Sequence, residues 1–231
     1  MIHTETSDTP EAVRVRARSV VLEGTLGCPA DAAGVVLFAH GSGSGRHSPR
    51  NRFVAEQLRR AGLATLLLDL LTEAEETLDH TAGHLRFNVS LLAERLLGAA
   101  DWLAANPRTA HLAVGCFGAS TGGGAALVAA ARRPDLVRAV VSRGGRPDLA
   151  ADELPAVRAP TLLIVGGNDE LVIDINQQAL ERLGARAKEL VIVPGASHLF
   201  EEPGALEQVA RLAASWFTRH LGEAAGRLPA G

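Results

Sequence analysis

The sequence predicts an α/β fold, in which a mostly parallel, twisted sheet carries helices on both faces. Short, continuous apolar runs alternate with longer segments of helical spacing along most of the chain. Such runs are typical of strands buried on both faces, and their alternation with helices implies right-handed crossovers between parallel strands. The 231 residues contain no internal repeat and no linker, so they fit one domain of this class.

The first part of the chain predicts a sheet edge and two buried strands. Small or apolar residues alternate with polar ones in the first two runs, which favours an antiparallel pair, and the next two runs are continuously apolar. The four expected strands are 13–18, 20–26, 34–39 and 64–69. Between the last two, Ser48 and Pro49 suit the cap and first residue of a helix that ends near Ala61, before Gly62.

The remaining elements continue the alternation of strand and helix. A central strand leads from His111 to Gly118, and further short strands are expected at 139–142, 161–165 and 188–193. Helices are expected at 88–105, 174–183 and 204–221, and the turn after the central strand is expected to lead into a helix that continues through 125–132. Two segments predict less regular structure: 72–83, a polar loop with a short helical piece, and 152–157, a brief linking helix or turn.

These elements place a single domain at residues 13–221. Residues 1–12 are expected to form a disordered tail and 222–231 a frayed one. The segment 141–160 is too short to hold a lid domain.

Composition excludes several classes of protein. A net charge of −3 argues against a nucleic-acid binder, which needs a basic face. No apolar run approaches the roughly 18 residues of a membrane span, and the polar N-terminus lacks the features of a secretory signal. Cys28 and Cys116 indicate neither a disulfide framework nor a metal site. We therefore expect a cytoplasmic protein with no metal and no membrane partner.

The most informative stretch is Gly118-Ala-Ser120-Thr-Gly122, which joins the central strand to the following helix. A serine at a sharp strand-to-helix turn is presented at the top of a sheet with its hydroxyl exposed. The small neighbours allow the turn to be tight, and the helix N-terminus directs N–H groups toward the serine. By itself the pattern is weak evidence in a chain with 24 glycines.

The rest of the chain supplies partners at corresponding positions. His40, Ser120, Asp169 and His198 each follow the end of an expected strand. Ligands bind beyond the carboxyl ends of strands in open parallel sheets, so these side chains are expected to gather at one edge.

These motifs resemble those of the α/β-hydrolase superfamily over residues 13–221. The run from His40 to Asn51, together with Gly118–Gly122, is most similar to dienelactone-hydrolase-like proteins. The resemblance implies the order nucleophile, acid, histidine, which Ser120, Asp169 and His198 match. Dienelactone hydrolases carry cysteine as nucleophile, whereas this chain has serine, so general ester chemistry is expected instead of dienelactone.

Chemistry assigns the roles. Ser120 needs a base to take its proton, and His198 suits that role because imidazole titrates near neutral pH. Asp169 would orient the imidazole and stabilise its charged form. The backbone N–H groups of Thr121 and Ser42 are expected to form the oxyanion hole.

Two points stay open in the sequence. Asp148 or Asp152 could supply the carboxylate in place of Asp169, because both follow the preceding strand. His40 is expected to support its loop and to take no part in the chemistry.

Five arginines lie on loops near the expected site: Arg46, Arg50, Arg52, Arg143 and Arg146. A guanidinium there could bind a carboxylate or phosphate of the substrate, or it could be solvated or paired with an acid. We take Arg46 and Arg143 as the candidate substrate-binding residues, favouring acid-bearing esters or lactones.

The sequence thus predicts a serine hydrolase for a small ester, lactone or thioester, without a cofactor or metal. Two alternatives remain: acyl transfer to an alcohol or amine by the same triad, and a catalytically silent ligand-binding or interaction protein of the same fold. The terminal helix or the edge hairpin could mediate a homodimer, although nothing in the sequence requires one.

Overall fold

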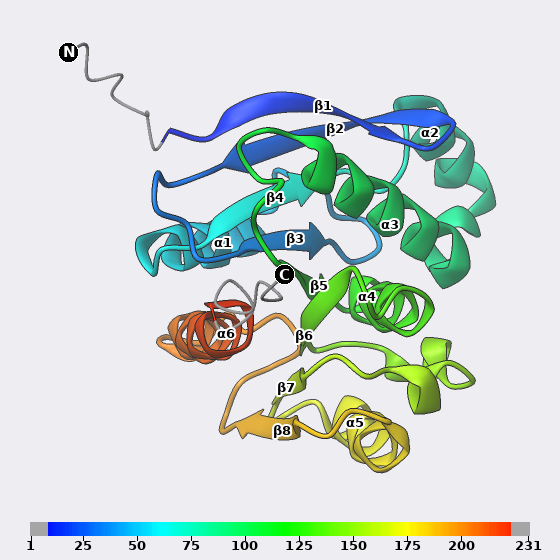
Figure 1. Cartoon of the computed structure of the whole chain (residues 1–231). Coiled ribbons are helices and arrows are strands. Elements are labelled where there is room, and N and C mark those ends of the chain that lie inside the picture. Colours follow the sequence, from blue (N-terminus) through cyan, green and yellow to red (C-terminus); the bar gives the residue numbers. More distant parts are fainter. Residues whose placement is uncertain (1–8, 223–231) are drawn as a thin grey trace.

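The computed structural model describes residues 9–222, which form one eight-stranded sheet covered by helices (Figure 1). The strand order is β1-β2-β4-β3-β5-β6-β7-β8. The strands are β1 (Glu11–Ala17), β2 (Val20–Gly27), β3 (Val35–Ala39), β4 (Ala64–Leu68), β5 (Val114–Ala119), β6 (Val137–Arg143), β7 (Thr161–Gly166) and β8 (Lys188–Val193). β2 pairs antiparallel with both β1 and β4, and all other pairs are parallel.

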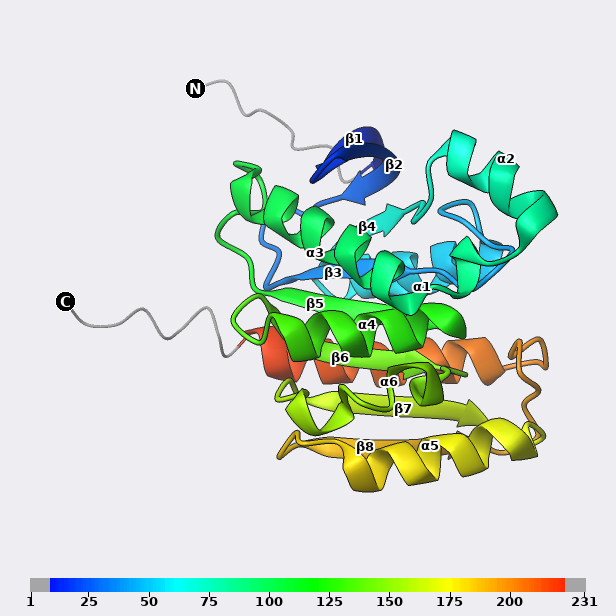
Figure 2. The same cartoon turned by 90° about the vertical axis from the view of Figure 1, so that its right-hand side faces the viewer.

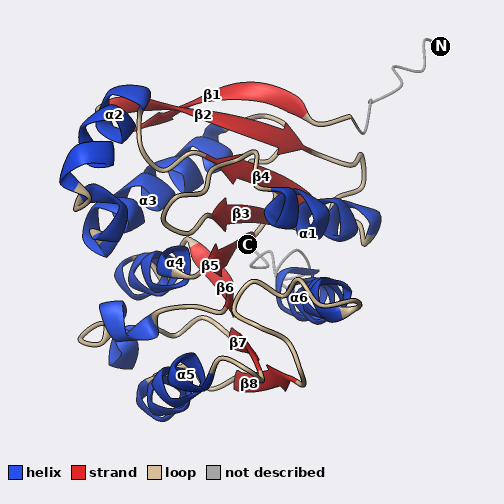
Figure 3. Cartoon of the chain, turned by 180° about the vertical axis from the view of Figure 1, so that it is seen from behind, coloured by secondary structure: helices blue, strands red, loops and turns tan. Residues whose placement is uncertain are grey.

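Helices cover both faces of the sheet, as Figures 1 and 3 show from opposite sides. They are α1 (Pro49–Arg60), α2 (Glu73–Ala82), α3 (Val89–Ala105), α4 (Thr121–Arg132), α5 (Glu170–Arg182) and α6 (Ala205–Gly222). α1 and α6 pack together on one face, while α3, α4 and α5 cover the other (Figure 1). Each face therefore has its own apolar core, and β3, β4 and β5 are buried on both sides.

The predicted fold class is confirmed, with differences at some boundaries. β1 begins at Glu11, two residues before the expected start of the domain. β6 and α5 also begin earlier than expected, at Val137 and Glu170. The outer parts of the expected tails, 1–8 and 223–231, lie outside the described residues.

The prediction of a loop with a short helical piece at 72–83 was wrong, because ten of these residues form α2. Thr72 caps the helix through its Oγ1, which accepts from the Glu75 N–H at 3.2 Å, and Glu75 Oε2 accepts from the Thr72 N–H at 2.8 Å. Gly83 ends it in a left-handed conformation. This reciprocal capping is readable as Thr-x-x-Glu in the sequence and offsets the weak apolar pattern of the helix.

The connections leave the carboxyl edge of the sheet accessible. Between β6 and β7 the chain forms two short 3-10 turns, η2 (Pro147–Ala150) and η3 (Leu154–Ala156), so no lid domain is inserted there. α2 stands beyond the end of β4, on the side toward which the parallel strands point (Figure 2). Within residues 9–222 no helix combines the length and apolar character needed to span a bilayer.

Candidate active site

Ser120 sits at a strained turn between β5 and α4. Its backbone has φ 51° and ψ −121°, a conformation that a residue with a side chain rarely adopts. Three backbone hydrogen bonds hold it: the Ser120 N–H donates to Arg143 O (3.1 Å), and Ser120 O accepts from Gly123 N–H (2.9 Å) and Arg146 N–H (3.1 Å). The fold thus fixes the serine in the conformation expected of a nucleophile elbow.

The glycines of the elbow are required by close backbone approach. A Cβ at Gly122 would lie 2.6 Å from the carbonyl carbon of Ala39, at the end of β3. A Cβ at Gly118 would lie 2.5 Å from Gly123 Cα, within the first turn of α4. No side chain at either position fits unless the sheet and the helix separate.

Backbone donors surround the serine. Thr121 is the first residue of α4, so its N–H has no partner within the helix and lies at the positive end of the helix dipole. Gly41 follows β3 and lies against the elbow, because a Cβ there would be 3.1 Å from Ser120 Cβ. The structure therefore brings Thr121 and the Gly41–Ser42 peptide to Ser120, where both were predicted to donate.

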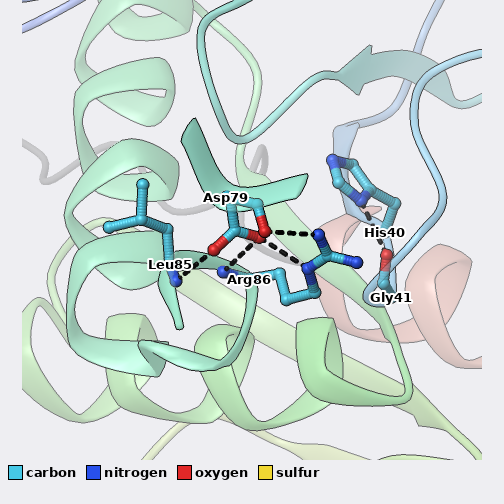
Figure 4. A network of polar contacts seen from close by, with 5 residues as sticks. All are labelled: His40, Gly41, Asp79, Leu85 and Arg86. Atoms are coloured by element: carbon cyan, nitrogen blue, oxygen red, sulfur yellow. Dashed lines mark hydrogen bonds and ion pairs between the residues drawn. The ribbon is translucent and has the colours of Figure 1, made fainter. Parts of the chain in front are cut away.

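His40 holds the Gly41–Ser42 peptide from the buried side (Figure 4). Its Nε2 accepts from the Leu70 N–H at 3.0 Å, so the ring proton is on Nδ1, 2.9 Å from Gly41 O. Burial lowers the pKa of His40, which favours this neutral form. Because a trans peptide points C=O and N–H in opposite directions, fixing Gly41 O also fixes the Ser42 N–H.

Asp169 and His198 meet beyond the ends of β7 and β8. Asp169 directly precedes α5, and His198 follows β8 in a loop. His198 Nδ1 lies 2.6 Å from Asp169 Oδ2, with side chains 39% and 17% exposed. The carboxylate thus fixes the tautomer that carries its proton on Nδ1 and leaves Nε2 to accept a proton.

The two loops that carry this pair are joined directly. The Asn168 N–H donates to Ala196 O at 2.9 Å, and Asn168 Nδ2 donates to Gly195 O at 2.8 Å. Glu202 accepts from the Ser197 N–H at 3.0 Å, and this hydrogen bond lowers the pKa of the Glu202 carboxyl. The backbone segments that directly precede the acid and the imidazole are therefore joined to each other.

The His198 ring and Ser120 contact neighbouring residues at the end of β6. His198 Cε1 would lie 3.4 Å from a Cβ at Gly144, whose neighbour Arg143 accepts the Ser120 N–H. Among the described residues no hydrogen bond joins the Ser120 hydroxyl to the imidazole. Such bonds often tighten only when substrate binds, so the relay from Ser120 remains a prediction.

The alternative carboxylates are placed elsewhere. Asp148 binds Arg146 through two hydrogen bonds of 2.8 and 2.7 Å, and this pairing lowers the pKa of the Asp148 carboxyl. Asp152 is exposed in the turn between η2 and η3. Of the three candidates, Asp169 is the one whose carboxylate contacts the imidazole.

The two candidate substrate-binding arginines differ in their surroundings. The Arg46 guanidinium forms an ion pair with Asp69, which also accepts the Arg46 backbone N–H at 2.6 Å. Arg143 is 7% exposed and stacks over Phe200, with Cζ 5.9 Å from the ring centroid. Its Nε and Nη1 are buried without a hydrogen-bond partner. Burial, and then the charge of Arg50, lower the pKa of Arg143 to about 10.

A cavity of about 750 Å³ opens beside the oxyanion loop. Gly41, Ser42 and Arg50 line it on one side, and α2 contributes residues on the other. Asp79 of α2 is buried and accepts from the Leu85 N–H and from Arg86 Nε, each at 2.5 Å, which fixes the end of α2 against the next turn (Figure 4). The sequence prediction missed this wall because it missed α2.

Cys116 does not compete with Ser120 as a nucleophile. It lies in β5, four residues before the serine, and burial raises the pKa of its thiol to about 12. Cys28 is also buried, and its thiol donates to Arg108 O at 3.7 Å. Within residues 9–222 no group of histidine, cysteine and carboxylate side chains has the arrangement of a metal site.

Comparison with known proteins places the chain in a known family. The dienelactone hydrolase family matches residues 22–221. A solved dienelactone hydrolase from Anabaena variabilis is 64% identical, with a TM-score of 0.90 over 92% of this chain and 98% of that chain. Est1E from Butyrivibrio proteoclasticus, 17% identical, covers 90% of this chain and 98% of that chain with a TM-score of 0.75, which shows the fold alone.

Two proteins from strains of Mycobacterium tuberculosis, provisionally named phosphoribosyl transferases, are 58% identical over 211 residues. The match covers 91% of this chain but 46% of those proteins, so the chain spans about half their length. Their name describes the whole proteins, whereas the family match covers most of this chain. The elbow, the acid–imidazole pair and the 64% identical dienelactone hydrolase all support hydrolase activity. The family match over residues 22–221 shows that the chain belongs to the dienelactone hydrolase family.

Proposed function

We propose that this chain hydrolyses small carboxylic esters, lactones or thioesters through an acyl-enzyme on Ser120. The observation that carries the proposal is the 2.6 Å contact between His198 Nδ1 and Asp169 Oδ2, at the edge of the sheet where the strained turn presents Ser120. A carboxylate that fixes an imidazole tautomer is the arrangement that general-base activation of a serine requires.

In the first half-reaction, Ser120 Oγ attacks the carbonyl carbon while its proton passes to His198 Nε2. The carbonyl oxygen becomes an oxyanion that accepts from the N–H groups of Thr121 and Ser42. The bond from carbon to the leaving oxygen or sulfur then breaks, and the imidazolium returns its proton to the leaving group. Asp169 stabilises the imidazolium without taking its proton.

In the second half-reaction, a water molecule gives its proton to His198 and attacks the acyl carbon. The tetrahedral intermediate collapses, the bond to Ser120 Oγ breaks, and the serine regains its proton from the imidazolium. A carboxylic acid leaves, and no redox change or metal is needed in either half-reaction.

The test combines turnover and covalent labelling. We expect p-nitrophenyl esters of short acids to give a burst of p-nitrophenol followed by steady turnover, and a fluorophosphonate to add to Ser120, as found by mass spectrometry. Ser120→Ala should abolish both signals, whereas Ser142→Ala, a buried serine on β6, should retain labelling. Turnover that survives Ser120→Ala would contradict the proposal.

A further inference from the structure

The backbone at the end of β6 holds the nucleophile from both sides of its peptide plane. The Arg143 carbonyl accepts the Ser120 N–H at 3.1 Å, and the Arg146 N–H donates to Ser120 O at 3.1 Å. Both bonds come from one short stretch, residues 143–146. A shift of this stretch would therefore move the serine, whose strained conformation depends on these two bonds.

Two glycines give this stretch little rigidity of its own. Gly144 has φ 51° and lies against the imidazole, since a Cβ there would be 3.4 Å from His198 Cε1. Its N–H donates to Ile164 O at 2.7 Å, which anchors it to β7. Gly145 has no room for a side chain, because a Cβ would collide with Ser142 Oγ. Since neither glycine can be replaced by a stiffer residue, hydrogen bonds from neighbouring elements must fix their backbone.

Asn176, in the middle of α5, binds the second glycine. Its side chain is fully buried, and its Nδ2 donates to Gly145 O at 3.0 Å and to Val172 O at 2.8 Å. Both partners are carbonyl oxygens, which only accept, so the amide can be oriented in one way only. A side chain of α5 thus fixes the peptide that follows Gly145.

The needs of α5 itself do not explain an asparagine at this position. Asparagine is a poor helix former, and Oδ1 of Asn176 is buried without a partner, which destabilises the fold. The bond to Val172 O adds little to the helix, because that carbonyl already lies four residues before an amide of α5. Departures from local preference of this kind occur mainly where function requires them. The bond to Gly145 O is therefore the one with a consequence outside α5.

The same helix also positions the acid. Asp169 directly precedes α5, and Asn176 follows it by seven residues, about 10 Å along the helix axis. α5 lies against β7 and against the 3-10 turn η2, which begins just after residue 146 (Figure 1). Because a helix moves as a rigid body over two turns, fixing Asn176 to Gly145 fixes the acid relative to the stretch that holds the serine and supports the imidazole.

We propose that Asn176 is a positioning residue, which holds Ser120, His198 and Asp169 in their relative positions through its hydrogen bond to Gly145 O. It acts through the backbone at the end of β6 and through α5, and it takes no part in proton transfer or in binding the substrate. This inference rests on the proposed function, because the relative positions of the three groups matter to the rate only if Ser120 is acylated.

The experiment replaces Asn176 by leucine, which has a similar volume and no hydrogen-bonding atom. With p-nitrophenyl acetate we expect kcat to fall by about tenfold or more, while KM stays within about twofold, because misplaced catalytic groups weaken binding of the transition state and leave that of the substrate. The rate at which a fluorophosphonate labels Ser120 should fall in parallel. Each variant is assayed well below the midpoint of its own thermal unfolding.

Two further variants separate positioning from stability. Asn176→Thr keeps a hydroxyl that can donate to Val172 O, four residues back, but is too short to reach Gly145 O. It should show the same loss of kcat, and it decides the matter if Asn176→Leu does not fold. Thr109→Val is the matched control: it removes a buried hydrogen bond, from Thr109 Oγ1 to Leu103 O at 2.7 Å, between α3 and β5. It should lower the unfolding midpoint and retain the wild-type kcat.

The outcomes separate the two proposals. A folded Asn176→Leu or Asn176→Thr protein with the wild-type kcat, or with a raised KM alone, overturns the positioning role while leaving the hydrolase intact. An equal loss of kcat in Thr109→Val also overturns it, because any lost buried hydrogen bond would then have the same effect. A wild-type protein that neither hydrolyses the ester nor is labelled at Ser120 overturns the proposed function itself.

Discussion

Replacing His40 by leucine tests how the oxyanion loop is held in place. The imidazole is buried between two backbone groups, accepting from the Leu70 N–H at 3.0 Å and contacting Gly41 O at 2.9 Å. Leucine offers neither a donor nor an acceptor, so the Leu70 N–H becomes a buried donor without a partner. Gly41 O retains the Ser44 N–H at 3.2 Å, which alone does not fix the peptide plane.

The substitution should lower two separate quantities, the free energy of unfolding and kcat. A buried unsatisfied donor lowers the free energy of unfolding by about 1–3 kcal/mol. Loss of one oriented oxyanion donor, the Ser42 N–H, lowers kcat by about a hundredfold, while KM changes little because the oxyanion exists only beyond the ground state. His40→Gln keeps one donor and one acceptor in a side chain of similar reach, so it should retain more of both quantities than His40→Leu.

Lowering the pH provides a second test of how the buried His40 ring contributes to stability. Burial lowers the pKa of His40 from its ordinary 6.5, against smaller opposing effects of Gly41 O, Asp69 and Glu76. Below about pH 6.5 the unfolded chain binds a proton that the folded chain does not, so the free energy of unfolding falls as pH drops, by at most about 1.4 kcal/mol per unit. Above that pH both states are neutral and His40 makes no pH-dependent contribution.

The assays are urea unfolding between about pH 7 and pH 5, and ester hydrolysis at neutral pH with kcat and KM measured separately. His111→Gln, at an exposed position before β5, controls for loss of an imidazole in general. The reasoning is refuted if His40→Leu leaves kcat unchanged, or if it raises KM alone.

Other substitutions probe the remaining contacts. Asp169→Asn should lower kcat by about four orders of magnitude, because the amide favours the wrong imidazole tautomer; Asp148→Asn should not, and similar rates for both variants would argue against the assigned pair. Gly122→Ala should reduce the free energy of unfolding by about 3 kcal/mol, because its Cβ would clash with backbone atoms. Gly62→Ala is the control and should cost about 1 kcal/mol, because Gly62 has a positive φ but open space around it. Denaturant curves with equal midpoints for the two variants would disprove this difference. Arg143→Met should raise the free energy of unfolding by about 1 kcal/mol by removing a buried unpaired charge, and a lower melting temperature would show that Arg143 has a partner in solution.

The sequence alone was sufficient for the fold class, and it named Asp169 as the partner of His198 while leaving Asp148 and Asp152 open until the structure showed the contact. Strands buried on both faces have unbroken apolar sequences, so they can be recognised in the chain. The carboxyl ends of parallel strands lie at one edge of the sheet, so the residues that follow these strands gather there. The same logic predicted the backbone N–H groups of Ser42 and Thr121 beside Ser120. Local patterns failed at 72–83, where the capping by Thr72 and Glu75 outweighs a weak apolar periodicity.

The tertiary structure alone determined which arginine side chains have a carboxylate partner. The sequence does not show whether Arg46 or Arg143 forms an ion pair, because pairing depends on which carboxylate the fold brings within reach. Asp69, from the end of β4, neutralises Arg46, whereas no carboxylate in residues 9–222 reaches Arg143. Likewise, the sequence predicted that His40 supports its loop, but only the fold brings Leu70, thirty positions away, to donate to its ring. Strength of an electrostatic interaction depends on distance and burial in three dimensions, and sequence spacing specifies neither.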